Sequence, residues 1–155
     1  MSCSTENEAA VVVSAVQKFA GLPGALLPLL HAVQADLGYI PGDCVATIAS
    51  GMGLSRAEVH GVISFYHDFH SEPQGHRIIH LCRAEACQAM GSRHLEQHVK
   101  TRLGIDYGET TADGRFSLQP VYCLGNCACS PSIRIGDAVH ARVGAVRFDQ
   151  LLDEN

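Results

Sequence analysis

The sequence predicts an α+β fold in which an all-helical unit is followed by a unit that mixes strands and helices. Apolar residues recur at helical spacing before Ser71, and short strand-like runs appear only after it. The polar stretch 71–75, with its Pro and Gly, is typical of a linker. Residues 1–72 hold Lys18 and Arg56 against seven acidic residues, a net charge of −5, whereas residues 73–155 hold nine of each sign. We therefore expect two domains, 1–72 and 73–155.

The first unit is expected to be a helical bundle, because turn residues separate four segments of helical periodicity. The turn segments are 21–24 and 38–42, both with Gly and Pro. Ser55 with Glu58 three residues later is a capping box, and Pro28 falls in the first turn of its helix, where its missing N–H costs little. The predicted helices cover residues 9–20, 25–37, 45–49 and 59–65.

The second unit is expected to be a sheet covered by helices, an α/β layer of the thioredoxin-like kind. Asp113-Gly114 and Gly136-Asp137 supply turns before and between predicted strands. The predicted strands cover residues 77–81, 116–121, 133–135 and 138–142, and the predicted helices cover 86–103 and 146–151.

Composition excludes several classes of protein. With 46% hydrophobic and 17% charged residues in 155, the chain has enough apolar material for a folded core. Its apolar runs are shorter than the roughly 20 residues that span a bilayer, and the start lacks the features of a secretory signal. We expect a cytoplasmic protein without direct membrane insertion. The net charge of −5 argues against nucleic-acid binding.

Seven cysteines are many for a cytoplasmic chain, where cysteine clusters more often bind metal or do redox work than form disulfides. Cys82 and Cys87 form one close pair and Cys123 and Cys127 another, which suggests four ligands. Four thiolates hold either a 2Fe-2S cluster or structural zinc, and the absence of a C-x2-C knuckle favours iron. A zinc-stabilised interaction module and a thiol-disulfide oxidoreductase remain alternatives, although the latter lacks its C-x-x-C.

The surroundings of the two pairs support this interpretation. Cys82 ends a predicted strand and Cys87 begins a predicted helix, whose amino terminus should lower a thiol pKa. Gly125 can take a positive φ and turn backbone N–H groups toward the sulfurs. Cys129 is expected to be a bystander, and Cys3 and Cys44 to be structural or inert. No catalytic residue or substrate site is predicted, and the histidines, including His94 and His98, receive no role.

With these residues placed, the chain resembles the thioredoxin-like 2Fe-2S subunit shared by respiratory complex I, NAD-reducing hydrogenases and NAD-dependent formate dehydrogenases. The matching segments are Leu-Leu-Pro-Leu-Leu-His-Ala-Val-Gln at 26–34, Gly-Tyr-Ile-Pro at 38–41, Glu-Val-His-Gly-Val-Ile-Ser-Phe-Tyr at 58–66, Asp-Gly-Arg-Phe at 113–116, and Cys-Leu-Gly-Asn-Cys at 123–127 followed by Pro131. The chain lacks the proline that complex I subunits often show before the second ligand. It looks closer to the gamma subunit of a molybdenum-dependent, NAD-linked formate dehydrogenase.

The resemblance implies that Cys82, Cys87, Cys123 and Cys127 bind one 2Fe-2S cluster. It also implies a partner subunit that binds FMN and NADH, because a nicotinamide releases two electrons as hydride and the cluster accepts one at a time. FMN, NAD and the molybdenum cofactor are expected only in partner subunits, and the chain alone is expected to be an electron carrier. The acidic helical unit is expected to dock on a partner. Arg83, Arg93 and Arg134 would favour reduction if they point at the cluster.

Overall fold

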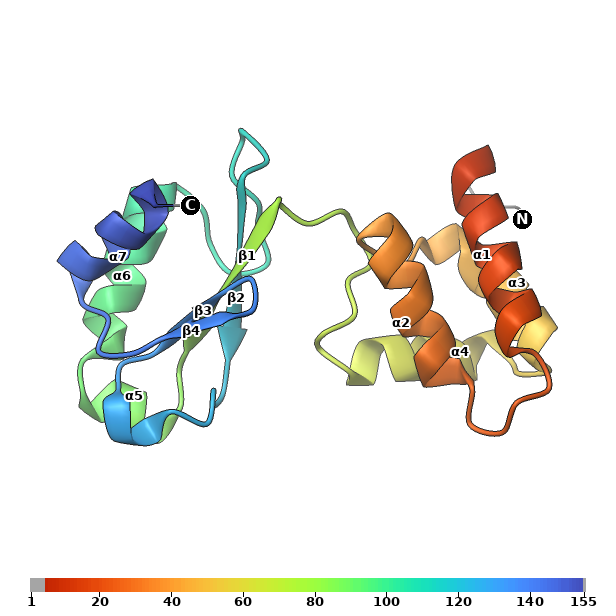
Figure 1. Cartoon of the computed structure of the whole chain (residues 1–155), viewed down its shortest axis with the longest axis horizontal. Coiled ribbons are helices and arrows are strands. Elements are labelled where there is room, and N and C mark those ends of the chain that lie inside the picture. The colour runs from red at the N-terminus through yellow and green to blue at the C-terminus, as the bar shows by residue number, and fades with distance from the viewer. Residues whose placement is uncertain (1–4, 155) are drawn as a thin grey trace. The chain divides into compact units, whose positions relative to one another are not determined.

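The structure, a computed structural model, describes residues 5–154 and divides the chain into two compact units between Pro73 and Gln74. The division lies one residue after the boundary expected from the sequence. Each unit has a hydrophobic core of its own. Figure 1 shows helices alone in the amino-terminal unit and a sheet with helices in the other. The predicted α+β fold class is confirmed.

Four α-helices build the amino-terminal unit: α1 (Glu6–Phe19), α2 (Leu26–Leu37), α3 (Val45–Met52) and α4 (Arg56–Phe65). A 3-10 turn, η1 (Gly42–Cys44), precedes α3. The predicted capping box of Ser55 and Glu58 begins α4, and a second one, from Thr5 and Glu8, begins α1. Pro28 lies in the first turn of α2, as expected.

The helices of this unit pack closely enough to make glycine necessary at one crossing. A Cβ on Gly51 of α3 would lie 2.2 Å from Cγ1 of Val16 in α1, so only a hydrogen fits there. Around this crossing, buried aliphatic side chains from α1, α2, α3 and α4 form the core, including Val12, Leu29, Val33, Ile48 and Val59.

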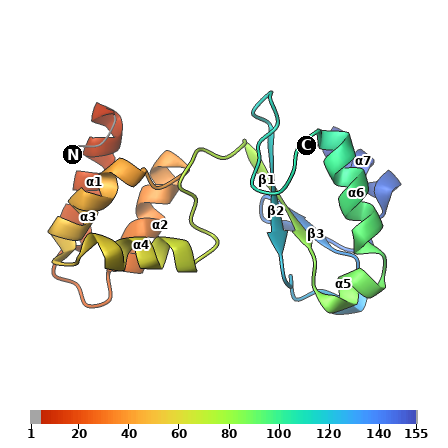
Figure 2. The ribbon, with the colours of Figure 1, turned by 180° about the vertical axis from the view of Figure 1, so that it is seen from behind.

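A four-stranded sheet organises the carboxy-terminal unit. Its strands are β1 (Arg77–Cys82), β2 (Phe116–Val121), β3 (Ile133–Ile135) and β4 (Ala138–His140), in the spatial order β2-β1-β3-β4. β1 pairs in parallel with β2 and antiparallel with β3, and β3 pairs antiparallel with β4 (Figure 2). Pro120, which has no N–H to donate, lies on the edge strand β2, where a missing donor is tolerated.

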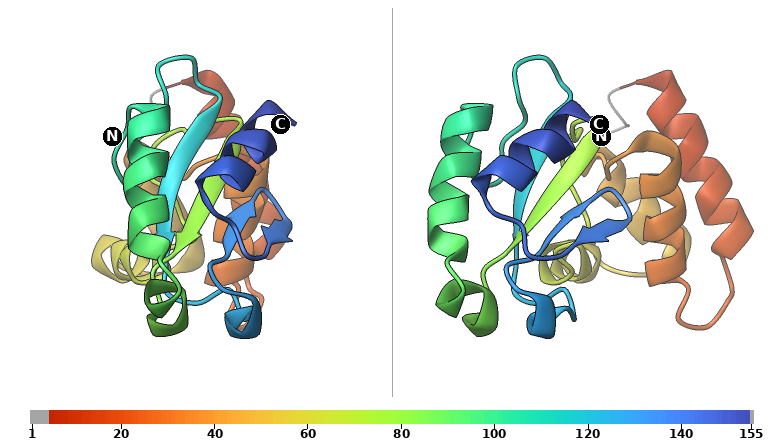
Figure 3. Two further views of the ribbon diagram at one scale, coloured as in Figure 1. Left: turned by 90° about the vertical axis from the view of Figure 1, so that its left-hand side faces the viewer. Right: turned by 60° about the vertical axis from the view of Figure 1, so that its left-hand side comes forward.

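Three helices complete this unit: α5 (Glu85–Ala89), α6 (Ser92–Leu103) and α7 (Ala145–Asp153). α6 and α7 cover the same face of the sheet (Figure 3). Ile79 and Leu81 of β1 pack with Leu95 of α6 and Phe148 of α7 in the core. Among the described residues, no helix is long and apolar enough to cross a membrane.

The single helix predicted over residues 86–103 is wrong, because the chain breaks it between α5 and α6. Gly91 has a φ of +93°, a conformation that residues with a Cβ rarely adopt, and it ends the run of helical residues. The break turns α6 back along the sheet. It also brings Ser92, at the start of α6, against the end of β1, where the Ser92 hydroxyl donates to the Cys82 carbonyl at 3.1 Å.

Candidate metal centre

The first cysteine pair lies at the end of β1 and in the helix that follows it. Cys82 is the last residue of β1 and Cys87 lies within α5, and each is only 2% exposed. The backbone between them is held on both sides: the Arg83 N–H donates to the Val121 carbonyl at 2.7 Å, and the side-chain amide of Gln88 donates to the Arg83 carbonyl at 2.6 Å. The strand end and the short helix therefore hold both thiols under the surface.

The second pair lies in the loop that follows β2. The sulfurs of Cys123 and Cys127 are 3.6 Å apart, and both residues are exposed. Gly125 takes the positive φ expected of it, +73°, and its N–H donates to the Cys123 sulfur at 3.3 Å. Cys123 itself has a φ of +153°, which is rare for a residue with a side chain and typical of constrained functional loops.

Parallel pairing brings the two cysteine pairs to one edge of the sheet. Cys82 pairs in register with Val121, so β1 and β2 end together and their following loops are neighbours. The Leu124 N–H of the second loop donates to the Cys82 sulfur. Across the same edge, the Cys87 sulfur lies 3.4 Å from the Ser130 hydroxyl, which follows the second pair in the chain. The two cysteine pairs therefore lie on neighbouring loops at this edge of the sheet.

The pKa values of the buried pair move in opposite directions. Burial raises the pKa of the Cys82 thiol, and N–H groups of Ala84 and Leu124 oppose it only in part. Burial also acts to raise the pKa of Cys87, but hydrogen bonds from Ser130, Cys82 and the Ser132 N–H outweigh it and bring that pKa below its ordinary value. Of the buried pair, Cys87 is therefore the thiol whose pKa is lowered, and hydrogen bonds cause the lowering.

In the exposed pair, the contact with Cys123 raises the pKa of the Cys127 thiol, because a second thiolate beside the first is unfavourable. Negative charge on Cys87 acts in the same direction. A bound cation would relieve this repulsion. The four thiols therefore form a site that favours positive charge.

The donor set fits a cluster with two metals. Two thiolates at about 2.3 Å from one tetrahedral metal are roughly 3.8 Å apart, close to the 3.6 Å between Cys123 and Cys127. Within residues 5–154, no three His, Cys, Asp or Glu side chains converge as ligands of a single ion. The thiols instead stand as two pairs, and a 2Fe-2S cluster takes two protein sulfurs on each iron. N–H groups aimed at the sulfurs suit an anionic cluster.

The remaining cysteines lie apart from this arrangement or contribute only backbone. Cys129 ends the 3-10 turn η2 (Cys127–Cys129), and its carbonyl accepts from the Arg142 N–H at 2.9 Å. Cys44 is buried in the helical unit and is disulfide-bonded. Cys3 lies outside the described residues.

The arginines named from the sequence find partners other than the sulfurs. Arg83 pairs with Glu96 at 3.1 Å, Arg93 donates to the side-chain amide oxygen of Gln88 at 2.8 and 3.0 Å, and Arg134 contacts the ring of His80. Of the paired helix histidines, His98 binds Asp149 at 3.0 Å, so it ties α6 to α7. The contribution of Ser92 and Ser130 to the site was not predicted, because both act across contacts distant in sequence.

Comparison with known proteins identifies the family of this arrangement. The family model of the thioredoxin-like 2Fe-2S ferredoxins matches residues 12–155. The chain belongs to this family. Its members carry a 2Fe-2S cluster, and the chain accordingly holds one such cluster. The resemblance stated from the sequence is confirmed at the level of the family.

Individual relatives are subunits of oxidoreductases. The chain is 37% identical over 142 residues to one of the NADH-quinone oxidoreductase subunits of Rhizobium meliloti, covering 92% of this chain and 84% of the relative. It is 34% identical to the HndA component of the NADP-reducing hydrogenase of Solidesulfovibrio fructosivorans, with the same shares covered. A crystal structure of NAD+-reducing NiFe hydrogenase superposes with a TM-score of 0.69 at 26% identity. That match covers 83% of this chain but only 22% of the hydrogenase chain.

Proposed function

We propose that Cys82, Cys87, Cys123 and Cys127 bind the 2Fe-2S cluster and that the chain is the one-electron-transfer subunit of an NAD-linked oxidoreductase complex. The observation that carries the proposal is the meeting of two thiol pairs, one buried and one exposed, at the shared edge of β1 and β2. When bound, the cluster accepts and releases single electrons. Cysteine spacing and donor geometry both support this assignment.

The protein's own groups do three things at the site. The ends of β1 and β2 set the positions of the thiols. N–H groups of Ala84, Leu124 and Gly125 donate to sulfur and offset negative charge there. Burial of Cys82 and Cys87 keeps water from one side of the cluster site. Exposure of Cys123 and Cys127 leaves the other side of that site open to a redox partner.

That partner is an FMN-containing, NADH-binding subunit of the same complex. A nicotinamide transfers a hydride, so a flavin must stand between it and a one-electron carrier. The relatives' names, NADH-quinone oxidoreductase and NADP-reducing hydrogenase, support a nicotinamide-linked assembly. We place the complex in the cytoplasm, with FMN, NAD and molybdenum cofactor in other subunits.

Within this group we propose an NAD-dependent formate dehydrogenase as the host complex. The segment Arg83-Ala84-Glu85-Ala86 supports this choice, since it lacks the proline that complex I subunits often carry before the second ligand. Complex I and an NAD-reducing hydrogenase are the alternatives, which the named relatives support. The activity and metal content of the isolated complex test this choice. Formate-dependent NAD+ reduction and bound molybdenum would support the proposal, whereas hydrogen-dependent or quinone-linked activity without formate oxidation would overturn it.

We propose docking as the task of the helical unit, whose expected domain covers residues 1–72. Phe69 packs inward, 7% exposed, but Phe65 and Tyr66 are 71% and 42% exposed. Their rings meet edge to face with centroids 5.1 Å apart. A pair of exposed aromatic rings at the end of α4 is suited to a partner interface.

Anaerobic purification of the full chain tests the cofactor and the ligands. Iron and acid-labile sulfide in equal amounts, with an electron-spin signal only after reduction, are the expected results. A colourless protein with zinc would indicate the interaction module instead. Metal-free protein whose thiols catalyse disulfide exchange would indicate the oxidoreductase alternative.

A further inference from the structure

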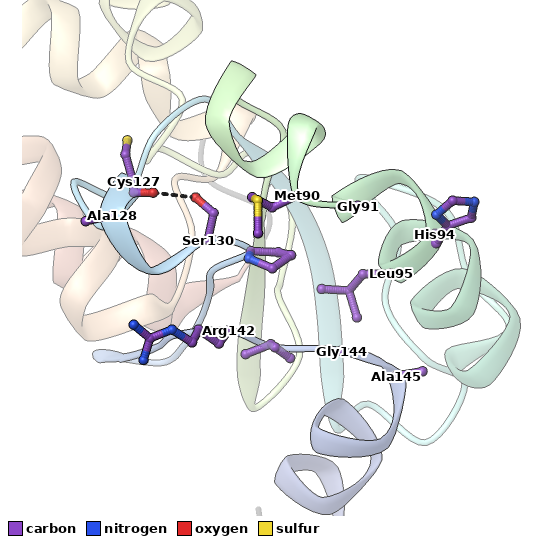
Figure 4. A pocket seen from close by; sticks show the side chains of 12 residues that line it. Met90, Gly91, His94, Leu95, Cys127, Ala128, Ser130, Arg142, Gly144 and Ala145 are labelled. Atoms are coloured by element: carbon purple, nitrogen blue, oxygen red, sulfur yellow. Dashed lines mark hydrogen bonds between the residues drawn. The ribbon is translucent and has the colours of Figure 1, made fainter.

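A mainly apolar pocket lies directly beside the second cysteine loop. It measures about 530 Å³ and is formed by the loop of Cys127, the junction of α5 and α6, and the segment that leads into α7 (Figure 4). Its apolar lining comes chiefly from Met90, Leu95, Pro131 and Val143. Met90 is 64% exposed, and methionine is a flexible side chain that adapts to a partner's surface.

Arg142 stands at the edge of this pocket in an unusual backbone conformation. Its φ is +51°, which is uncommon for a residue with a Cβ. Two hydrogen bonds at 2.9 Å hold the segment there: the Arg142 N–H donates to the Cys129 carbonyl, and the Val143 N–H to the Pro131 carbonyl. The loop that carries Cys127 therefore fixes the position of Arg142.

The Arg142 side chain carries a charge that no carboxylate among residues 5–154 neutralises in an ion pair. Other arginines of this unit, such as Arg83, Arg102 and Arg147, pair with carboxylates. None of the ion pairs between residues of the described range 5–154 includes Arg142. An exposed cation at the rim of an apolar pocket is complementary to a carboxylate that stands beside an apolar side chain.

The position of the pocket, beside the exposed cysteine pair, favours a protein over a small molecule. The lining does not separate the two, because small-molecule sites are also mainly apolar with a few polar groups. Here the charged or titratable lining consists of Arg142, His94 and Cys127, around an apolar centre. Because Cys127 belongs to the exposed pair, an occupant of this pocket also lies next to the side of the cluster that a redox partner must approach.

We propose that this pocket is the docking point of the flavin-bearing, NADH-oxidising subunit, which inserts an apolar side chain between Met90 and Val143 and places a carboxylate on Arg142. The inference rests on the proposed function and adds to it the surface that the electron partner uses. Docking there places the partner at the Cys123 and Cys127 side of the cluster.

Charge changes at Arg142 test the ionic part of the contact. Arg142→Asn and Arg142→Asp both place a residue that tolerates positive φ, so the backbone is retained. The affinity of the purified holoprotein for the purified flavin-bearing subunit should fall slightly for Arg142→Asn and about tenfold or more for Arg142→Asp. The loss should appear mainly in the association rate, and it should be smaller at high salt. Arg115→Asn and Arg115→Asp are the matched controls, because Arg115 precedes β2 at the opposite end of the sheet. They should bind as the wild type does.

A photo-activated cross-linking residue tests the position. Placed at Met90 in the full complex, it should link to the flavin-bearing subunit, whereas at the exposed Thr101 near the far end of α6 it should not. A cross-link from Met90 to another subunit or to none, or unchanged binding of Arg142→Asp, overturns the proposal. The electron-spin signal of the reduced protein is recorded for the wild type and for each variant. If the reduced wild type gives no such signal, or if its complex contains no flavin subunit, the proposed function is refuted and the docking site with it.

Discussion

The Ser130 hydroxyl lies 3.4 Å from the Cys87 sulfur and donates a hydrogen bond to the Cys127 carbonyl at 2.8 Å. One buried serine thus contacts both a thiol of the buried pair and the backbone of the exposed pair. When a metal replaces the thiol proton, the Ser130 hydroxyl can turn from the Cys127 carbonyl and donate to the Cys87 sulfur, to which the Ser132 N–H also donates. Hydrogen bonds to ligand sulfur favour the more negative, reduced state of a cluster.

Ser130→Ala should therefore lower the reduction potential. The expected change is a few tens of millivolts, below the roughly 59 mV that corresponds to a tenfold change in a one-electron equilibrium. A redox titration followed by the electron-spin signal measures it. Ser117→Ala, a buried serine near the start of β2, is the control and should leave the potential unchanged. A raised potential in Ser130→Ala would contradict the role assigned to the hydroxyl.

Replacing the proposed ligands one at a time should separate them from the neighbouring thiol. Serine at Cys82, Cys87, Cys123 or Cys127 should bleach the visible absorption or weaken it sharply, since a serine oxygen is a poorer ligand for iron than a thiolate. Cys129→Ser should keep the colour, the iron content and the signal. Loss of the cluster in Cys129→Ser, with retention in one of the other four, would require a different ligand set.

The Arg83–Glu96 ion pair should hold the reduction potential of the cluster between the values that the two single-charge variants give. Arg83 follows Cys82 directly, and its side chain is 36% exposed while that of Glu96 is 15% exposed. Arg83→Gln removes a positive charge and should lower the potential; Glu96→Gln removes the compensating negative charge and should raise it. The double variant should lie between them.

The same redox titration checks these shifts, which should shrink at high salt because the pair is partly exposed. Glu154→Gln, which breaks the pair between Arg147 of α7 and Glu154 at the end of that helix, is the control. If Arg83→Gln and Glu96→Gln shift the potential in the same direction, the charge of this pair does not act on the cluster.

Two glycines should respond oppositely to alanine. At Gly91 a φ of +93° makes a Cβ unfavourable, so Gly91→Ala should lower the free energy of unfolding by about 1–2 kcal/mol. Gly61 lies inside α4, and a Cβ there meets nothing within 4 Å. Gly61→Ala should raise the free energy of unfolding by about 0.5–1 kcal/mol, because alanine loses less backbone entropy. Urea unfolding of the holoprotein measures both; a stabilised Gly91→Ala would show that the break between α5 and α6 is dispensable.

Phe65→Ser should weaken assembly of the complex without affecting the cluster. The ring is 71% exposed, so its removal costs the isolated chain little, whereas a partner that covers it would lose the apolar contact. Size-exclusion chromatography of the complex measures the fraction assembled. Leu22→Ser, at a 55% exposed position in the loop after α1, is the matched control. Equal assembly of both variants would remove the aromatic pair from the docking role.

The amino-acid sequence alone determined the periodic elements, the helix start at Ser55 and the two cysteine pairs. These features depend on local rules: apolar spacing, a capping box, and the close spacing of the two cysteines in each pair. For the same reason the strand at 116–121 matched β2 in full. The conformation of Gly125 also followed from its own lack of a side chain.

Tertiary structure decided the environment of those cysteines. Parallel pairing of β1 with β2 places Cys82 beside Leu124, and the return of the chain after β2 places Ser130 beside Cys87. Glu96 reaches Arg83 only because α6 turns back at Gly91. Such contacts join residues far apart in the chain, and their energies depend on distance and burial that no local pattern encodes. Hence the sequence could indicate the proposed ligands, while the folded chain specifies which of these cysteines are buried, which are exposed and what surrounds them.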